Sequence, residues 1–317
     1  MPARNLETSP HTAADLIQSS PVALALKILG DRWSWLILRD VFLGVRRFED
    51  LRRLTGTARG TLTARLQSLV ENGLLYRNPY QTAPERFEYR LTDKGFGLYP
   101  VALTLWAWET KWTDDNEGLP GKLTHRSCGK VTTPVIQCRA CRETLRASDV
   151  DYFAGPGARS ETVHPPHTQR RRRSKTKHPE GVDKSFFHVV DIFGDRWTGM
   201  ILAAIWFNQH RYDDIAAAIG ISTNILSDRL KRLTAAKVLE RRGYRDNPVR
   251  YEYRMTEKGW DLYGAAILLH QWGDQWLVGD KGATLRFEHH CGEALHCDVT
   301  CGVCSETLVP GTITYNR

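Results

Sequence analysis

The sequence lacks several features that would place the protein in other functional classes. No stretch approaches the 18 or so apolar residues of a membrane span, and Met1–Pro10 contains no apolar signal core. We therefore expect a cytoplasmic protein without membrane contacts, where disulfides are uncommon and clustered cysteines indicate metal or redox chemistry. There is no nucleophile–base set, no phosphate-cradling loop and no H-E-x-x-H motif, so we expect no enzymatic activity.

Positive charge is concentrated in one segment. The formal net charge is +8, but six Lys and Arg residues lie in Arg170–Lys177, and about +2 remains without them. The polar, Pro-containing surroundings predict a solvated linker, which could also contact phosphates. The rest of the chain is nearly balanced, so its charge alone is weak evidence for nucleic-acid binding.

An internal repeat organises the chain. Gly30–Trp33 and Gly194–Trp197 both read GDRW, and the same shift of 164 residues aligns RFEYRLTDKG (Arg86–Gly95) with RYEYRMTEKG (Arg250–Gly259). A fixed register without gaps over some 90 residues predicts two copies of one structural unit.

Each repeat has the pattern of a winged helix. In the first, apolar residues at helical spacing predict helices in Val22–Gly30 and Arg32–Phe42, then a short helix ending at Gly56 and a second helix ending at Gly73. The alternation in RFEYRLT predicts the second strand of a β-hairpin. A helix-turn-helix followed by a hairpin is a winged helix.

Each repeat then ends in a helix with an aromatic stripe that includes Trp108 and Trp112, or Trp272 and Trp276. The stripe could cover only its own domain, but so many tryptophans favour packing between the repeats as an intramolecular pseudo-dimer. The fold class predicted is mainly α with small β wings: two tandem winged helix-turn-helix domains, each followed by a small Cys-rich lobe. The boundaries expected are 15–115 for the first winged helix, 122–155 for its lobe, 156–182 for the linker, 183–279 for the second winged helix and 284–317 for its lobe.

These motifs resemble those of the HxlR-type family of bacterial winged helix-turn-helix transcription regulators. The resemblance rests on GDRW, on R-F-x-x-L, on L-x-x-R-L-x-x-L and on EYRLTDKG and EYRMTEKG, and covers Pro21–Trp112 and Asp183–Trp276. It implies a sequence-specific regulator of transcription, with repression favoured. Because members of the family usually act as homodimers, it also implies that the two covalently linked winged helices bind two DNA half-sites.

The signal that the protein responds to is open. Some family members sense oxidants or electrophiles through a cysteine just before the first helix, where this chain has Ser20 and Lys184. Redox sensing by that route is therefore not expected. A small-molecule effector, bound between helices near the aromatic stripes, and further homo-oligomerisation are both compatible with the sequence.

The second helix of each helix-turn-helix is expected to enter the major groove, with the wing near the minor groove or backbone. Since the helix starts differ, TARG against ISTN, we predict unlike half-sites about one helical turn apart. Arg86 and Arg250 could instead pair with Glu88 and Glu252, any one contact residue could be merely solvated, and the whole protein could be a non-specific architectural binder. The predicted DNA contacts are Arg47, Arg59, Thr61, Thr63, Arg65, Arg86, Arg211, Ser222, Thr223, Asn224, Ser227, Arg229, Arg232 and Arg250.

The cysteines follow the repeat as well. Both segments after the winged helices read C-G-x8-C-x2-C, and only Cys297 is left over. Cys-x2-Cys suits one side of a tetrahedral structural zinc site; free or redox-active thiols and a disulfide are the alternatives. The predicted ligand sets are Cys128, Cys138, Cys141 and His125 in the first lobe, and Cys291, Cys301, Cys304 and His290, with His289 as the alternative, in the second.

Overall fold

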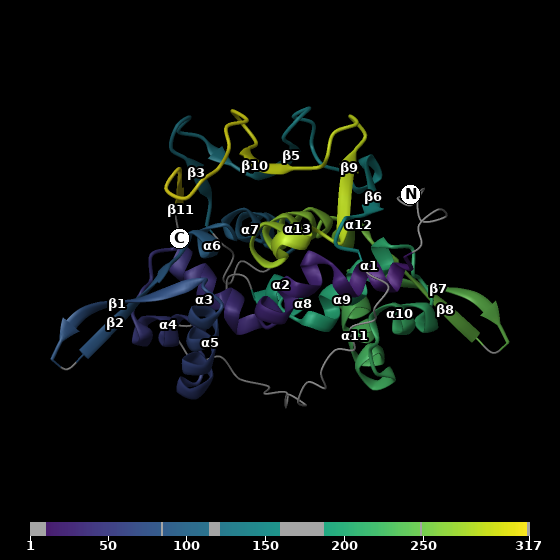
Figure 1. The fold of residues 1–317 in the computed structure, drawn as a ribbon, viewed down its shortest axis with the longest axis horizontal. Coiled ribbons are helices and arrows are strands. Elements are labelled where there is room, and N and C mark those ends of the chain that lie inside the picture. The colour runs from purple at the N-terminus through teal and green to yellow at the C-terminus, as the bar shows by residue number, and fades with distance from the viewer. Residues whose placement is uncertain (1–10, 84, 114–120, 159–186, 248, 316–317) are drawn as a thin grey trace.

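Helices are the commonest regular structure of the protein and, apart from the first helix, occur in the same order in both repeats (Figure 1). The computed structural model describes residues 11–83, 85–113, 121–158, 187–247 and 249–315, so the basic segment Arg170–Lys177 and most of the expected linker lie outside the described residues. The helices of the first repeat up to its helix-turn-helix are α1 (Ala13–Ser19), α2 (Pro21–Leu29), α3 (Arg32–Phe42), α4 (Phe48–Thr55) and α5 (Arg59–Glu71). Those of the second are α8 (Phe187–Phe193), α9 (Arg196–Trp206), α10 (Tyr212–Ile219) and α11 (Thr223–Ala235).

Local sequence explains the helix-turn-helix boundaries. The Asp31 carboxylate accepts hydrogen bonds from the first-turn N–H groups of α3, and Asp195 does the same for α9. Gly56 and Gly220 end α4 and α10 at left-handed φ values of 66° and 64°, a conformation that glycine adopts without steric cost. The chain therefore turns sharply into α5 and α11.

A β-hairpin wing follows each helix-turn-helix. The first wing pairs β1 (Leu75–Thr82) with β2 (Glu85–Leu91), and the second pairs β7 (Leu239–Asp246) with β8 (Val249–Met255), both antiparallel. Short helices α6 (Asp93–Phe96) and α12 (Glu257–Trp260) lead into the long helices α7 (Tyr99–Trp112) and α13 (Tyr263–Leu277). The predicted fold class of two tandem winged helices is confirmed.

The GDRW motifs lie where the two repeats meet. Asp31 and Asp195 form an antiparallel backbone bridge with each other. A Cβ atom at Gly30 would lie 2.7 Å from Cβ of Arg196, and one at Gly194 would lie 2.9 Å from Cα of Arg32. Glycine is required at both positions because an added Cβ would also meet a carbonyl oxygen of the preceding helix, that of Leu26 or of Val190, at less than van der Waals distance.

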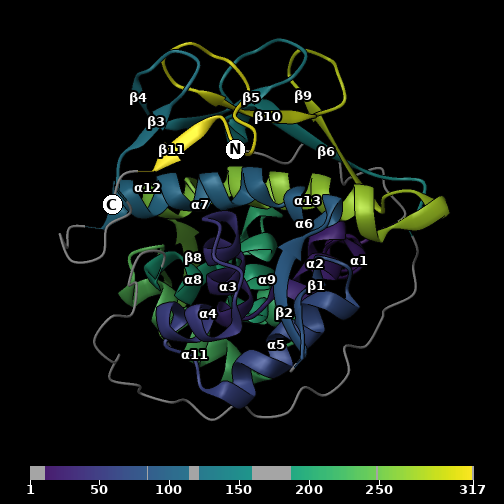
Figure 2. The ribbon, with the colours of Figure 1, turned by 90° about the vertical axis from the view of Figure 1, so that its left-hand side faces the viewer.

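The aromatic helices α7 and α13 also join the repeats, in a layer between the winged helices and the cysteine-rich part (Figure 2). Trp108 Nε1 donates to the Lys258 carbonyl oxygen at 2.9 Å, and Trp272 Nε1 donates to the Lys94 carbonyl oxygen at 2.8 Å. Each tryptophan thus crosses to the other repeat and satisfies its buried N–H there. The stripe packs between the repeats rather than over one domain alone.

The cysteine-rich segments form one interleaved lobe, which corrects the expectation of separate lobes at 122–155 and 284–317. Strand β5 (Pro134–Cys138) pairs with β10 (Cys297–Cys301), while β3 (Leu123–His125), itself paired with β4 (Val131–Thr132), takes β11 (Ile313–Tyr315) as its other neighbour. Strand β6 (Val150–Ala154) after η1 (Ala147–Asp149) pairs with β9 (Leu285–His289) after η2 (Gly279–Lys281). Strands of two to five residues are too short to bury a face alone, so each segment completes its sheet with its copy.

Candidate nucleic-acid interface and metal centres

We call the second helix of each helix-turn-helix, α5 or α11, its recognition helix. Both lie on the side of the molecule away from the cysteine lobe. Figure 1 shows α5 and α11 at the bottom of the view, the wings pointing outward at either side, and the lobe at the top. Along these helices Arg59, Thr63, Ser222, Thr223, Asn224 and Ser227 are exposed, and Thr61 is half-buried. The structure therefore brings the helices that carry most of the predicted contact residues to one side of the molecule.

One arginine in each repeat, Arg47 or its equivalent Arg211, connects the helix-turn-helix to the wing. The Arg47 guanidinium lies 5.0 Å from the ring centre of Tyr80, and Arg211 lies 4.8 Å from that of Tyr244. The backbones of Arg47 and Arg211 also bridge to Glu88 and Glu252 on the second wing strands. Both arginines are exposed, so they fix the direction of the wing while their N–H groups remain available for phosphates.

Arg65 and Arg229 have partners inside the protein. Arg229 Nε and Nη2 each lie 2.9 Å from the Asp195 carboxylate, and Arg65 Nη1 lies 3.3 Å from Asp31 Oδ2. Burial raises the pKa of Asp195, but the hydrogen bonds and charge of Arg229 outweigh it and hold that pKa below its usual value. These arginines attach each recognition helix to the GDRW motif, a positioning role that their prediction as DNA contacts did not include.

The remaining arginines predicted to contact DNA differ in whether they pair with acidic side chains of the protein. Arg59 pairs with Glu49 and lies over the Phe48 ring, and Arg232 Nη2 lies 2.9 Å from Asp228. In the wings, Glu88 and Glu252 pair with Arg90 and Arg254. The alternative partners suggested for Arg86 and Arg250 are thus taken by other arginines, and both side chains are exposed.

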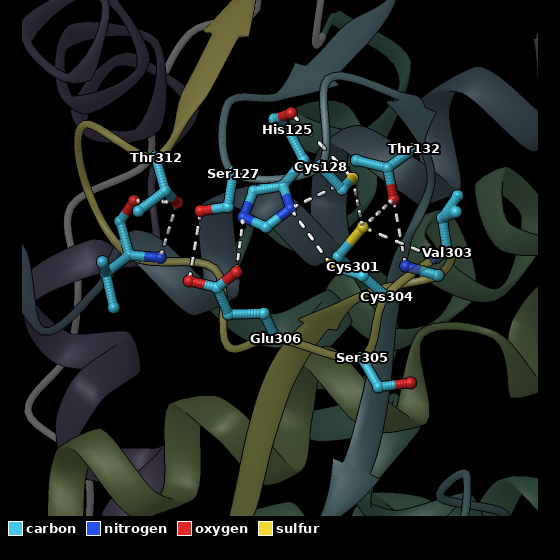
Figure 3. Close-up of polar contacts among 12 residues, drawn as sticks. His125, Ser127, Cys128, Thr132, Cys301, Val303, Cys304, Ser305, Glu306 and Thr312 are labelled. Carbon is cyan, nitrogen blue, oxygen red and sulfur yellow. Dashed lines mark hydrogen bonds and ion pairs between the residues drawn. The ribbon is translucent and has the colours of Figure 1, made fainter.

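The first candidate metal centre would take two ligands from each repeat (Figure 3). The ligand atoms of His125, Cys128, Cys301 and Cys304 all lie within 4.8 Å of one another. His125 Nδ1 is 3.5 Å from Cys128 Sγ and 3.3 Å from Cys304 Sγ, and Cys128 Sγ is 3.9 Å from Cys301 Sγ. Around a tetrahedral ion with Zn–S bonds of about 2.3 Å, neighbouring sulfurs lie about 3.8 Å apart, so the donor set fits zinc.

The second candidate centre has the opposite arrangement. Here the first repeat supplies the Cys-x2-Cys pair, and the second repeat supplies the histidine and the remaining cysteine. Cys138, Cys141, His289 and Cys291 lie within the same distance of one another, and Cys141 Sγ is 3.4 Å from His289 Nδ1. Neither predicted ligand set is therefore complete within its own lobe. The antiparallel pairing of β5 with β10 places the two Cys-x2-Cys turns at opposite ends of the ribbon, beside the histidine strand of the other repeat.

His289, rather than the predicted His290, lies with the three cysteines of this centre, which corrects the predicted ligand set. His290 Nε2 lies 2.5 Å from a Glu143 carboxylate oxygen, at the edge of the site. The ligand atoms of Cys141, Glu143, His289 and His290 are also close enough to share an ion, but this set reuses Cys141 and His289. One signal in the sequence was missed: His125 and His289 are 164 residues apart, the shift of the winged helices.

The first cysteine of each Cys-x2-Cys turn favours the thiolate form that binds metal. At the second cysteine, Cys141 or Cys304, a backbone hydrogen bond lowers the pKa, but burial and the neighbouring thiols outweigh it and raise that pKa. Burial raises the pKa of Cys301, but hydrogen bonds from the Thr132 hydroxyl and from the backbone N–H groups of Cys304 and Val303 outweigh it and lower that pKa to about 6. In the second centre, backbone N–H groups of Cys141 and Ala140 likewise lower the pKa of Cys138 against the effect of burial. Cys297 lies in neither centre, and burial raises its pKa to about 12.

These features define a helix-turn-helix protein with two winged helices in one chain. The model of the HxlR-like helix-turn-helix family matches residues 28–117 and 192–281, and the chain belongs to this family. Within the part of the chain that the structure describes, no helix is both long enough and apolar enough to cross a membrane.

The curated relatives are named as transcriptional regulators rather than enzymes. The uncharacterized HTH-type transcriptional regulator Rv3095 of Mycobacterium tuberculosis is 42% identical over 144 residues, which are 45% of this chain and 91% of that protein. YdeP of Bacillus subtilis, also an uncharacterized HTH-type transcriptional regulator, is 31% identical over 112 residues, or 35% of this chain and 88% of its own. Each alignment covers less than half of this chain but most of the relative.

Two solved structures of candidate transcription factors are also similar in sequence. PA1607 is 34% identical with a TM-score of 0.38, covering 41% of this chain and 92% of its own. PA1374 from Pseudomonas aeruginosa is 35% identical with a TM-score of 0.30, covering 39% and 85%.

Proposed function

We propose that the protein is a sequence-specific DNA-binding transcriptional regulator in which the two winged helices of one chain bind two adjacent half-sites. The observation that carries this proposal is the placement of α5 and α11 on the side of the molecule opposite the cysteine lobe, with one wing extending outward beside each (Figure 1). The GDRW contact supports a fixed spacing between the helices, because Asp31 and Asp195 bridge to each other and also bind Arg65 and Arg229. Phosphate contacts would come from Arg47, Arg211 and the wings.

The two half-sites would differ in sequence. Arg59 and Gly60 begin α5, where the second repeat has Thr223 and Asn224 at the start of α11. An asparagine can pair with adenine through two hydrogen bonds and an arginine with guanine, whereas glycine contributes no side chain. Repression by blocking access to a promoter follows most simply, because it requires only occupancy of the DNA.

The metal centres would be structural zinc sites that hold the two repeats together. Three thiolates and one imidazole are a common closed donor set for structural zinc and leave no position for substrate. Because each centre draws on both repeats, metal binding would stabilise the interleaved lobe and, through α7 and α13, the arrangement of the winged helices.

The proposal is tested by fluorescence anisotropy with the DNA upstream of the protein's own gene, scrambled competitor and a salt series. We expect binding that survives excess competitor, and we expect Asn224→Ala to weaken it about tenfold, in line with about 1–3 kcal/mol for a base contact. Arg126→Ala, on the exposed surface of the lobe, is the matched control and should bind as the wild type does.

Two outcomes would contradict the proposal. Equal loss of binding to scrambled DNA, with a steep salt slope, would favour the non-specific architectural protein instead. If the upstream fragment does not bind, selection from random DNA decides, and failure to enrich any sequence would reject specific recognition.

A further inference from the structure

A cavity of about 470 Å³ lies in the first repeat, between the end of α3, the base of the wing, helix α7 and strand β11. Its walls are mainly apolar, and include Phe42, Tyr99, Leu103 and Trp106. Small-molecule sites commonly occupy about 300–1,000 Å³ and combine apolar walls with a few polar groups. The cavity has the size and lining of such a site.

Its polar groups are mostly hydrogen-bond donors. Arg39, Arg46 and Arg90 all line the cavity, Arg39 paired with Asp40 and Arg90 with Glu88. Arg46 is exposed, and its charge acts on the nearby Glu88 carboxylate, which is already paired with Arg90. An acidic group on a ligand would therefore find a cation at the rim of this cavity.

Trp106 adds a donor in the wall. Its side chain is 7% exposed, and its buried Nε1 has no hydrogen-bond partner among the residues that the structure describes. A buried N–H without a partner is less stable than one that is bonded. Because this atom is closed to solvent, a ligand oxygen could accept its hydrogen bond only after a shift of the indole ring.

The second repeat fills the corresponding space with larger side chains. Phe42 and Phe96 are replaced by Trp206 and Trp260, whose rings lie 5.5 Å and 6.5 Å from the ring of Tyr263. Two of the three cationic positions are lost as well, since Arg39 and Arg46 correspond to Ala203 and His210, whereas Arg90 corresponds to Arg254. The same framework therefore leaves room for a ligand in one repeat and closes it in the other.

We propose that the first repeat binds a small aromatic carboxylate in this cavity, with its ring between the apolar walls and its carboxylate towards Arg46. Tyr76 and Leu91 at the base of the wing line the cavity, as does Ile313, which pairs with the metal ligand His125 across β11 and β3. A bound ligand would thus contact the wing of the first repeat and the shared, interleaved cysteine lobe together. This site goes beyond the proposed DNA recognition, and its test requires no DNA.

The probe is 4-benzoylbenzoate, an aromatic carboxylate that also crosslinks under ultraviolet light, with its neutral amide for comparison. Calorimetric titration of the full-length protein at pH 8 should show one site per chain. Phe42→Trp combined with Phe96→Trp installs the residues of the second repeat, and should weaken binding at least tenfold. Arg46→His should weaken binding of the carboxylate threefold or more and leave binding of the amide unchanged. His210→Arg, the reverse change in the second repeat, is the matched control and should have no effect.

Irradiation should attach the probe to peptides from α3, α7 or β11, a result that does not depend on whether a variant folds. The proposal is overturned if the wild type does not bind at millimolar probe, or if the crosslinks map elsewhere. It is equally overturned if the double tryptophan variant keeps the thermal stability of the wild type and binds the probe equally well.

Discussion

The two repeats share the residues that join them and differ in the residues that face outward. Asp31 with Arg65 matches Asp195 with Arg229, and the hydrogen bonds of Trp108 and Trp272 to the opposite repeat have the same geometry. The starts of the recognition helices differ, and two phenylalanines that line a cavity in the first repeat are tryptophans in the second. Contacts between the repeats constrain both copies at once, whereas each outer surface can specialise by itself.

The largest effect is expected from breaking one metal centre. Cys301→Ser removes a ligand shared between the repeats, and total metal analysis should fall from two zinc ions per chain to one. Structural zinc contributes about 10–16 kcal/mol of apparent binding energy in zinc-finger peptides, so we expect a loss of stability on the order of 5 kcal/mol. The measurements are elemental analysis and urea unfolding.

Cys297→Ala is the control for this variant, because Cys297 is buried in the same strand but lies outside both centres. It should keep two zinc ions. Unchanged zinc content in Cys301→Ser would contradict the assignment of the first centre.

A smaller effect is expected from detaching one recognition helix. Arg229→Ala removes both hydrogen bonds to Asp195 and leaves that largely buried carboxylate with fewer partners. We expect a loss of about 2 kcal/mol in urea unfolding at pH 7 and weaker DNA binding. Arg65→Ala, which removes a single longer contact, should cost less. Equal costs for the two variants would show that the number of hydrogen bonds does not determine the effect.

The pH dependence of stability gives the ion pair of Asp195 and Arg229 a second test. The pKa of Asp195 is lower in the folded protein than in the unfolded chain, where it is about 3.9. The ion pair with Arg229 therefore stabilises the folded protein fully above that pH, and this stabilisation is lost as the pH falls through the lower pKa of the folded state. The stability difference between wild type and Arg229→Ala should therefore shrink as the pH is lowered below about 4. Melting temperatures of both proteins from pH 7 to pH 3 would show this, and a constant difference would exclude the ion pair as its cause.

Making the two recognition helices alike should alter DNA sequence preference rather than stability. Arg59→Thr combined with Gly60→Asn gives α5 the first residues of α11. We expect the first half-site to become similar to the second, with changes of about 1–3 kcal/mol at the affected base pairs. Selection from random DNA should then return a more palindromic site than the wild type selects. Identical selected sites would show that these positions do not contact bases.

The smallest effect is expected at the wings. Arg86→Ala and Arg250→Ala should each weaken binding less than tenfold and similarly for all sequences, because phosphate contacts carry no sequence information. Each should also reduce the slope of log affinity against log salt by about one. A change in base preference without a change in slope would instead indicate readout of the minor groove.

Most of the fold was determined by the sequence alone. The repeated register, the helix starts at Asp31 and Asp195 and the glycine turns at Gly56 and Gly220 depend on neighbours within a few residues, so they can be recognised locally. The same holds for the types of metal ligand, because Cys-x2-Cys places two sulfurs in one turn.

Only the tertiary structure decided which residues act together. Cys128 lies with Cys301 rather than Cys138, and Arg65 binds Asp31 rather than facing outward, because strand pairing and helix packing join segments far apart in the chain. Hydrophobic periodicity indicates which face of a single helix or strand is buried. It contains no information about which other helix or strand packs against that face. Two segments with the same cysteine spacing can pair within a repeat or between repeats with the same local pattern, and the packing of the whole chain selects the pairing between repeats.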